Sequence, residues 1–234
     1  MAAAVVTGAG GDIGRALCAA FVADGLRVYG ADIAPLEPRE GVVPVRLDIT
    51  DRAAVFALAE RAAAEPGGLR LWINAAGIVR VVSALEANSD DWDRLIAVNL
   101  TGTFHGCAAA LAAMRHQGFG RIVNLGSLSG QVGGTGVHPA YGASKAGVHA
   151  LTRTYALEGA KYGVYCNAVA PSVLEGSMGS EFTERQREQL ARANPLRRLG
   201  RVEEVVDAVR YLANDTASYT NGVILPINGG SYLS

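Results

Sequence analysis

The chain is poor in the features that mark many secreted, metal-binding and nucleic-acid-binding proteins. It contains only three cysteines, Cys18, Cys107 and Cys166, and none of them forms a Cys-x-x-Cys pair. This number and spacing argue against a disulfide framework and against a zinc site. The 21 lysines and arginines nearly balance the 22 aspartates and glutamates. A net charge of −1 therefore gives no electrostatic basis for binding nucleic acid.

Long hydrophobic runs are also missing. No apolar run approaches the roughly 18 residues that a membrane-spanning helix needs. The segment before Gly8 is too short to hold a charged region followed by an apolar one, as a secretion signal would require. We therefore expect a soluble, cytoplasmic protein with no metal and no membrane or nucleic-acid partner.

Glycine and apolar residues, in contrast, are abundant. Half of the 234 residues are hydrophobic and 29 are glycine, a composition that suits a buried parallel sheet with tight turns. The length fits a single domain over residues 1–234. Apolar runs predict strands near residues 3–7, 26–32, 42–47, 69–74, 120–126, 163–169 and 222–226. Helices are predicted at 13–24, 51–64, 89–116, 140–161, 180–193 and 202–213. This alternation indicates an α/β protein with a doubly wound parallel sheet.

A glycine-rich loop follows the first predicted strand, with the sequence Thr7-Gly8-Ala9-Gly10-Gly11-Asp12-Ile13-Gly14. Glycines let the backbone approach a diphosphate closely, and the helix that follows offers free N–H groups and positive potential. A plain turn is the alternative. Asp32 favours a dinucleotide site, because it ends the second strand 18 residues after Gly14, where a carboxylate binds the adenosine ribose.

The charge of Asp32 also predicts which dinucleotide binds. A carboxylate accepts hydrogen bonds from both ribose hydroxyls of NAD and repels the extra phosphate of NADP. The positions from which a compensating cation would act are uncharged, and Arg39 is the nearest alternative; these positions are Ala9, Gly10, Gly11, Ile33 and Ala34. We therefore expect NAD.

Tyr141 and Lys145 form a second pattern with chemical meaning. Residues four apart are neighbours on a helix surface, so the Lys145 ammonium is expected about 5 Å from the Tyr141 oxygen. At an effective dielectric constant of about 20, this charge would favour the phenolate by about 3 kcal/mol. The pKa of Tyr141 is then predicted to fall by about two units, which suits a general acid or base. A solvated helix face is the alternative interpretation.

Together these motifs resemble the short-chain dehydrogenase/reductase family, nearly end to end. The glycine loop is followed in the family's order by Asn74-Ala75-Ala76-Gly77, by Asn99, by Ser127 and by Tyr141-x-x-x-Lys145. The resemblance implies a Rossmann fold, with a single doubly wound parallel β-sheet flanked by helices. The usual helix between the second and third strands is missing, because only residues 33–41, with two prolines, connect them.

The resemblance also implies roles for the conserved motif positions. Tyr141 would act as general acid or base, Lys145 would lower its pKa and hold the nicotinamide ribose, and Ser127 would bind the substrate oxygen. Asn99 would support a water that relays protons through Lys145. The cofactor would contact Gly8, Gly11, Asp12, Ile13, Gly14, Asp32, Asp48, Ile49, Asn74, Ala75, Gly77, Tyr141, Lys145, Pro171, Val173 and Leu174.

Three of these residues also have ordinary structural interpretations. Asn99 could distort or cap the long helix, and Ser127 could be a turn residue at a strand end. Asp48 resembles the family's contact to the adenine amino group, but Asp48 or Thr50 could instead be a helix N-cap.

The chain departs from the family pattern at several positions. Asp12 stands where the fingerprint has its middle glycine, and its carboxylate could cap the first helix. Ser172 replaces a glycine, and Gly176 aligns with the threonine that holds the nicotinamide carboxamide. Ser177 would substitute for that threonine only if the loop shifts.

The substrate pocket is expected between two loops. Ser127 lies 14 residues before Tyr141, one more than is usual, which enlarges loop 130–139. Gln131 and His138 are the polar candidates of that wall, with a solvent-exposed imidazole as the alternative for His138. The other wall is expected in residues 174–192, a short lid that contains Met178 and Phe182.

The resulting prediction is an NAD-dependent oxidoreductase that interconverts a small or medium-sized secondary alcohol and a ketone. A sensor or scaffold that binds the dinucleotide without turnover is one alternative, and an epimerase or lyase that uses bound NAD is another. The family resemblance also implies a homotetramer, assembled through the long helices that hold Asn99 and Tyr141 and through the last strand.

Overall fold

A parallel seven-stranded sheet forms the centre of the protein. The computed structural model describes residues 1–134, 136–176 and 182–233. The strands follow the order β3-β2-β1-β4-β5-β6-β7, so the chain reverses its winding direction between β1 and β4. Their bounds are β1 Ala3–Thr7, β2 Arg27–Asp32, β3 Val42–Arg46, β4 Leu69–Asn74, β5 Gly120–Leu125, β6 Val164–Pro171 and β7 Ile224–Ile227. In such sheets ligands bind beyond the carboxyl ends of the strands at the point of reversal.

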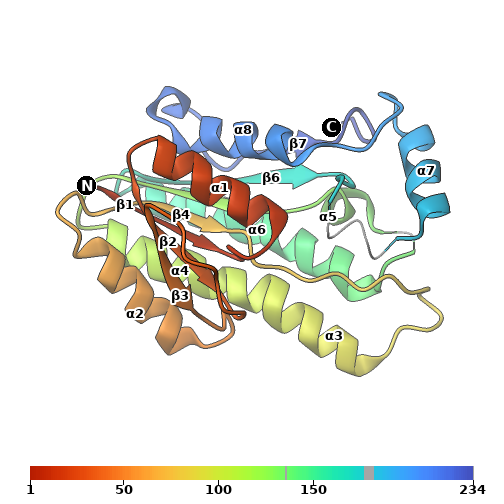
Figure 1. The fold of residues 1–234 in the computed structure, drawn as a ribbon, viewed down its shortest axis with the longest axis horizontal. Helices are drawn as coiled ribbons and strands as arrows, with labels where there is room; N and C mark the ends of the chain where they lie inside the picture. The colour runs from red at the N-terminus through yellow and green to blue at the C-terminus, as the bar shows by residue number, and fades with distance from the viewer. Residues whose placement is uncertain (135, 177–181, 234) are drawn as a thin grey trace.

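Helices cover both faces of this sheet (Figure 1). One face carries α1 Asp12–Ala23 and α8 Val202–Ala213, and the other carries α2 Arg52–Ala63, α4 Gly102–Met114 and α6 Pro139–Ala160. Along β1, Ala3 and Val5 pack into one hydrophobic layer while Ala4 and Val6 pack into the other. Both faces of the strand are therefore buried, which explains its continuous apolar sequence.

The predicted doubly wound sheet is confirmed, and residues 33–41 cross from β2 to β3 without a helix. The predicted helix over 89–116 is interrupted. It consists of α3 Ser89–Ile96, a π-helical turn over Ala97–Thr101, and α4. Two short elements were not predicted, α5 Ser129–Val132 and the 3₁₀ turn Asp215–Ala217. Helix α7 covers Glu184–Ala193, and residues 180–181 of its predicted range lie outside the described residues.

The continuous helical stretch Ser89–Met114 is long and apolar enough, by length and composition, to cross a membrane. In its most apolar window, 56% of the residues are buried inside the protein, as in the core helix of a folded domain. Its α4 part packs against α2, β4 and α6, which accounts for its apolar composition.

Candidate active site

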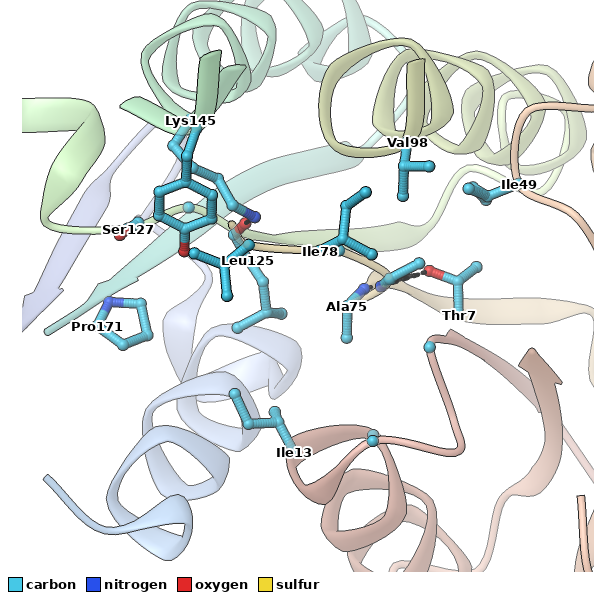
Figure 2. Close-up of a pocket in the computed structure, with 18 of the residues that line it drawn as sticks. Thr7, Ile13, Ile49, Ala75, Ile78, Val98, Leu125, Ser127, Lys145 and Pro171 are labelled. Carbon is cyan, nitrogen blue, oxygen red and sulfur yellow. Dashed lines mark hydrogen bonds between the residues drawn. The ribbon is translucent and has the colours of Figure 1, made fainter. Parts of the chain in front are cut away.

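A cavity of about 620 Å³ opens at the carboxyl ends of the strands, where the winding reverses between β1 and β4. Figure 2 shows Ser127 and Lys145 on one side of it and Thr7, Ile49 and Val98 on the other. Loops that follow six strands supply most of the wall, and helices supply the rest. The lining consists of residues 7–8, 11–14, 31–33, 47–50, 75–79, 125–129 and 171–174 with Arg94, Ala97, Val98, Val137, Tyr141, Lys145 and Phe182.

Two glycines of the loop after β1 are required by close backbone contacts. Gly8 has a φ of +69°, and a Cβ there would lie 2.7 Å from the Ala76 backbone. A Cβ on Gly14 would lie 2.1 Å from the Gly8 carbonyl oxygen. Helix α1 begins directly afterwards, with Gly11 as an N-cap that contributes no side-chain hydrogen bond. The first turn of α1 therefore lies at the cavity wall without a side-chain cap from Gly11, an arrangement that fits a diphosphate.

Asp32 is oriented by two backbone hydrogen bonds at the end of β2. Its Oδ2 accepts from the Gly10 N–H at 2.9 Å, and its Oδ1 accepts from the Ala34 N–H at 3.0 Å. Each oxygen keeps a second lone pair, so the carboxylate can also accept from a ligand. Asp32 lines the cavity, and its geometry fits a pair of ribose hydroxyls.

Asp48 also lines the cavity, beside Ile49. Its Oδ1 accepts hydrogen bonds from the Thr50 N–H at 2.9 Å and the Thr50 hydroxyl at 2.7 Å, and these bonds lower the pKa of Asp48. The N-cap of α2 is Asp51, whose side chain accepts from the Ala54 N–H. The alternative in which Asp48 or Thr50 caps this helix is therefore wrong, and Asp48 is left to face the cavity as a carboxylate.

Thr7 has a role that the sequence did not reveal. Its hydroxyl accepts hydrogen bonds from the N–H groups of Ala75 (Figure 2) and Ala76, both at 3.2 Å. It also donates to the Ile73 carbonyl at 3.3 Å. These bonds fix the loop after β4 against the glycine loop. The available signal was a polar residue ending β1, because β1 pairs with β4 at the reversal point.

Asn99 lies in the π-helical turn and is fully buried behind the cavity wall rather than in its lining. Its Oδ1 accepts from the Ile78 N–H at 2.8 Å, and its Nδ2 donates to the Ile78 carbonyl at 2.9 Å. A Cβ on Gly77 would lie 3.3 Å from Asn99 Oδ1 and 3.5 Å from Lys145 Nζ. The absence of a side chain at Gly77 thus brings the Asn99 amide and the Lys145 ammonium to one narrow space.

Tyr141, Ser127 and Lys145 meet at the other end of the cavity. The Ser127 and Tyr141 hydroxyls form a hydrogen bond, and Ser127 Oγ also accepts from the Ser129 N–H at 3.1 Å. Lys145 Nζ donates to the Leu125 carbonyl at 2.7 Å and lies 5.9 Å from the centre of the Tyr141 ring (Figure 2). Two hydroxyls and an ammonium are therefore close enough to act on one reacting C–O bond.

The charge states of this group differ from the sequence-based prediction. Burial raises the pKa of Tyr141, and the hydrogen bond from Ser127 only partly opposes this. Burial lowers the pKa of Lys145 to about 8. The predicted fall in the pKa of Tyr141 is therefore wrong for the protein alone, because loss of solvent outweighs the nearby ammonium.

Asn74 does not line the cavity, in contrast to the other predicted cofactor residues. It belongs to a buried polar network on the far side of the strand ends. Asn74 Oδ1 accepts from the Trp72 indole at 2.7 Å, and Asn74 Nδ2 donates to Asn124 Oδ1 at 2.8 Å. Asn124 in turn donates to the Thr152 hydroxyl at 2.9 Å. The Asn74 side chain is thus fully used in joining β4, β5 and α6.

Asp12 lines the cavity at the start of α1 but does not cap this helix, since Gly11 is the N-cap. Its carboxylate pairs with Arg15, and a Cβ on Gly176 would lie 2.6 Å from its Oδ2. Asp12 therefore touches the segment that follows β6. Ser177 and Met178 lie outside the described residues, whereas Ser172 and Phe182 belong to the lining.

The structure contradicts both predicted roles of His138, which lies in the loop before α6. This imidazole is buried, its Nδ1 accepts from the Ala140 N–H at 3.2 Å, and its Nε2 lies 3.0 Å from the Asn88 carbonyl. His138 is neither a pocket wall nor exposed to solvent, because it caps α6 and ties it to α3. Gln131 is also absent from the lining. The apolar residues Leu128 and Val137 supply this wall instead.

Metal-ligating groupings are not found among the described residues, where no three His, Cys, Asp or Glu side chains are placed to share an ion. The three cysteines are free and buried.

Comparison with known proteins identifies the family. The family model described as enoyl-(acyl carrier protein) reductase matches residues 8–232. The chain is 35% identical to 3-oxoacyl-(acyl-carrier-protein) reductase FabG of Thermotoga maritima, over 97% of this chain and 96% of the relative. It is 39% identical to galactitol 2-dehydrogenase (L-tagatose-forming) of Cereibacter sphaeroides, over 98% of this chain and 94% of the relative.

A solved structure agrees with this relationship. The crystal structure of gox2181 superimposes with a TM-score of 0.90 at 30% identity, covering 98% of this chain and 95% of that one. Membership in one family explains the fold, the glycine-rich loop after β1 (the glycine cradle), and the cluster of Ser127, Tyr141 and Lys145. This chain belongs to the short-chain dehydrogenase/reductase family, oxidoreductases that bind a nicotinamide dinucleotide.

Proposed function

We propose that the protein is an NAD-dependent dehydrogenase that interconverts a secondary alcohol and a ketone. The observation that carries this proposal is the hydrogen-bonded pair of Ser127 and Tyr141, with Lys145 beside it, in the same cavity as the glycine cradle and Asp32. A dinucleotide that lay between these groups would bring its ring to the two hydroxyls.

Tyr141, Ser127 and Lys145 each have a different role in the proton transfer. The bound nicotinamide supplies or accepts the hydride. In ketone reduction, Tyr141 donates its proton to the carbonyl oxygen while the Ser127 hydroxyl hydrogen-bonds the same oxygen. The raised pKa of Tyr141 keeps this proton in place at neutral pH. Alcohol oxidation reverses these steps, and the Lys145 ammonium then stabilises the phenolate that forms.

The preference for NAD over NADP is supported by the surroundings of Asp32. Its carboxylate would repel an added phosphate, and the adjacent lining residues Ala31, Ile33 and Leu47 carry no charge. The cations among the described lining residues are Arg94 and Lys145. They come from α3 and α6, not from the glycine loop or the end of β2.

The substrate class is supported by two relatives whose names describe the same conversion. Galactitol 2-dehydrogenase and 3-oxoacyl-(acyl-carrier-protein) reductase each interconvert a hydroxyl-bearing carbon and a ketone. We propose a small or medium-sized substrate, because the lid is short. Turnover of substrates attached to acyl carrier protein, and of no free alcohol or ketone, would refute this size limit.

A single experiment tests the proposed function. The protein is mixed with NAD and a panel of polyols, cyclic alcohols and 3-hydroxyacyl thioesters, and the absorbance of reduced nicotinamide is followed. We expect turnover that Tyr141→Phe lowers at least about 100-fold, with little change in NAD binding measured by calorimetry. Binding of NAD without turnover on any substrate would favour a sensor. Conversion of a substrate without net change in absorbance would favour an epimerase or lyase.

We also propose that the protein is cytoplasmic and assembles as a homotetramer. The assembly is supported by large apolar side chains exposed on the long helices and near the C-terminus, among them Phe104, Leu157, Tyr219 and Leu233. The location is supported by three free cysteines, as expected in a reducing compartment. A monomer in light scattering would reject the tetramer.

A further inference from the structure

We propose that His149 is a positioning residue that holds the loop 126–130 in place and so aims Ser127 at Tyr141. This inference rests on the proposed function, because Ser127 and Tyr141 are the residues that would contact the substrate. His149 itself lies behind the cavity wall and is not part of its lining.

The position of His149 on α6 makes this role possible. Tyr141, Lys145 and His149 follow one another at intervals of four residues, so they share one face of the helix. Tyr141 and Lys145 face the cavity, whereas His149 lies one turn further along and is only 4% exposed. The imidazole therefore continues the reactive face of α6 beneath the loop that carries Ser127.

Contacts on both sides of Ser127 connect His149 to this loop. A Cβ on Gly126 would lie 2.4 Å from His149 Nε2, and a Cβ on Gly130 would lie 2.7 Å from its Cε1. The Gly130 backbone also makes a polar contact with His149, which favours the protonated imidazole and raises its pKa. The Val169 carbonyl also accepts from the Gly126 N–H at 2.8 Å. The loop is thus clamped by the backbone of β6 and by the imidazole.

The clamped loop in turn fixes the Ser127 hydroxyl. Ser127 Oγ accepts from the Ser129 N–H at 3.1 Å within the same turn and hydrogen-bonds Tyr141. A shift of the loop would change both contacts at once. Movement of a reacting group by about 1 Å can lower a rate about 100-fold, so the loop's position matters to the chemistry.

An apolar side chain at position 149 would not hold the loop 126–130 in the same way. Among the described residues, His149 Nε2 has no hydrogen-bond partner although it is buried, an arrangement that costs stability. A leucine would avoid this cost but would lack the polar contact with the Gly130 backbone. Burial, together with Arg153 and Lys145 on α6, lowers the pKa of His149 to about 4, so the imidazole is neutral at pH 7.

A double-mutant cycle tests the proposal. His149→Leu, Ser127→Ala and the double variant are compared with the unmodified protein, and Thr152→Val serves as a control. Thr152 is buried one turn away on α6 and bonds Asn124 rather than the Ser127 loop. We expect His149→Leu to lower kcat about tenfold or more with NAD affinity unchanged. The double variant should be no slower than Ser127→Ala, and Thr152→Val should leave kcat nearly unchanged.

A second measurement needs no turnover and no cofactor. Carbon-13 at Cζ of tyrosine reports hydrogen bonding of the hydroxyl, and Tyr141→Phe assigns the signal of Tyr141. We expect His149→Leu and Ser127→Ala to shift this signal in the same direction, with no further shift in the double variant. His149→Gln keeps a polar side chain beside Gly130 and should restore part of the original shift. It also replaces His149→Leu if that variant fails to fold.

The outcomes separate failure of the inference from failure of the proposed function. If the unmodified protein turns over no substrate, the proposed function fails, and the Tyr141 signal still tests His149. An unchanged Tyr141 signal in both His149 variants, or additive losses of kcat in the double variant, would overturn the positioning role.

Discussion

Replacing Lys145 with methionine should stabilise the folded protein at neutral pH while removing its activity. The Lys145 side chain is almost fully buried, and among the described residues its ammonium donates to the Leu125 carbonyl but forms no ion pair. A buried charge without a counter-charge is costly, and this cost lowers the pKa of Lys145 to about 8. Methionine has a similar length and carries no charge.

The magnitude follows from the pKa shift. The pKa falls from 10.5 to about 8, and each unit corresponds to about 1.4 kcal/mol, so the penalty is about 3 kcal/mol. Between pH 8 and 10.5 the unfolded chain holds the lysine proton and the folded protein does not, so stability rises with pH in this window. Methionine leaves the Leu125 carbonyl without this hydrogen bond, which lowers the gain in stability by about 1 kcal/mol. The net gain at pH 7 is therefore about 2 kcal/mol, or about 4–8 °C in Tm.

Urea unfolding at pH 7 and pH 10 measures this gain directly. Lys161→Met is the matched control, because the Lys161 side chain is 63% exposed and pairs with Glu158. We expect Lys145→Met to be more stable than the unmodified protein at pH 7 and to lose this advantage at pH 10. Equal stability at pH 7, or the same gain at both pH values, would show that the buried ammonium is not strained.

Four further predictions concern the cofactor site, the reaction and acid stability. Gly14→Ala places a Cβ 2.1 Å from the Gly8 carbonyl oxygen and should weaken NAD binding at least about tenfold. A near-normal NAD affinity measured by calorimetry would contradict the role of the glycine loop in binding the cofactor. Tyr141→Phe should lower kcat about 100- to 10,000-fold with little change in NAD affinity, and steady-state kinetics check this. Asp32→Ser should raise the preference for NADP, measured as the ratio of kcat/KM for the two cofactors, and an unchanged ratio would remove Asp32 from this role. His149 has its pKa lowered from 6.5 to about 4, so stability should fall by up to about 3 kcal/mol as pH drops through this range; His149→Leu should lack this fall in urea unfolding, and identical slopes would contradict the buried neutral imidazole.

The sheet could be predicted from the sequence because its signals are local. Apolar runs such as Ala3–Thr7 end at turns, and most of them are followed by a helical segment of sufficient length. The break in the long helix before α4 could not be predicted in this way. The π-helical turn over Ala97–Thr101 accompanies hydrogen bonds from Asn99 to Ile78, 21 residues away. A distortion coupled to so distant a contact leaves little trace in local periodicity.

The site was predictable to the extent that its residues end strands or lie on one helix face. Carboxyl ends of parallel strands meet at one edge, so Asp32, Asp48 and Ser127 were expected to converge, and all three line the cavity. Asn74 also ends a strand, but Trp72 and Asn124 engage its side chain inside the protein. His138 lies just before α6 and becomes its N-cap. Tertiary packing decides which polar side chains form hydrogen bonds inside the protein and which remain available to a ligand.

The pKa of Tyr141 shows why a pairwise estimate from spacing failed. That estimate considered one attraction, between the phenolate and the ammonium, in a medium of fixed polarity. In the folded protein Lys145 hydrogen-bonds the Leu125 carbonyl, and burial penalises the charged forms of both Lys145 and Tyr141. The protein alone therefore holds Tyr141 as a neutral proton donor, which is the form that ketone reduction requires. Removing that proton, as alcohol oxidation requires, becomes easier only when additional positive charge or a hydrogen-bonding oxygen enters the cavity.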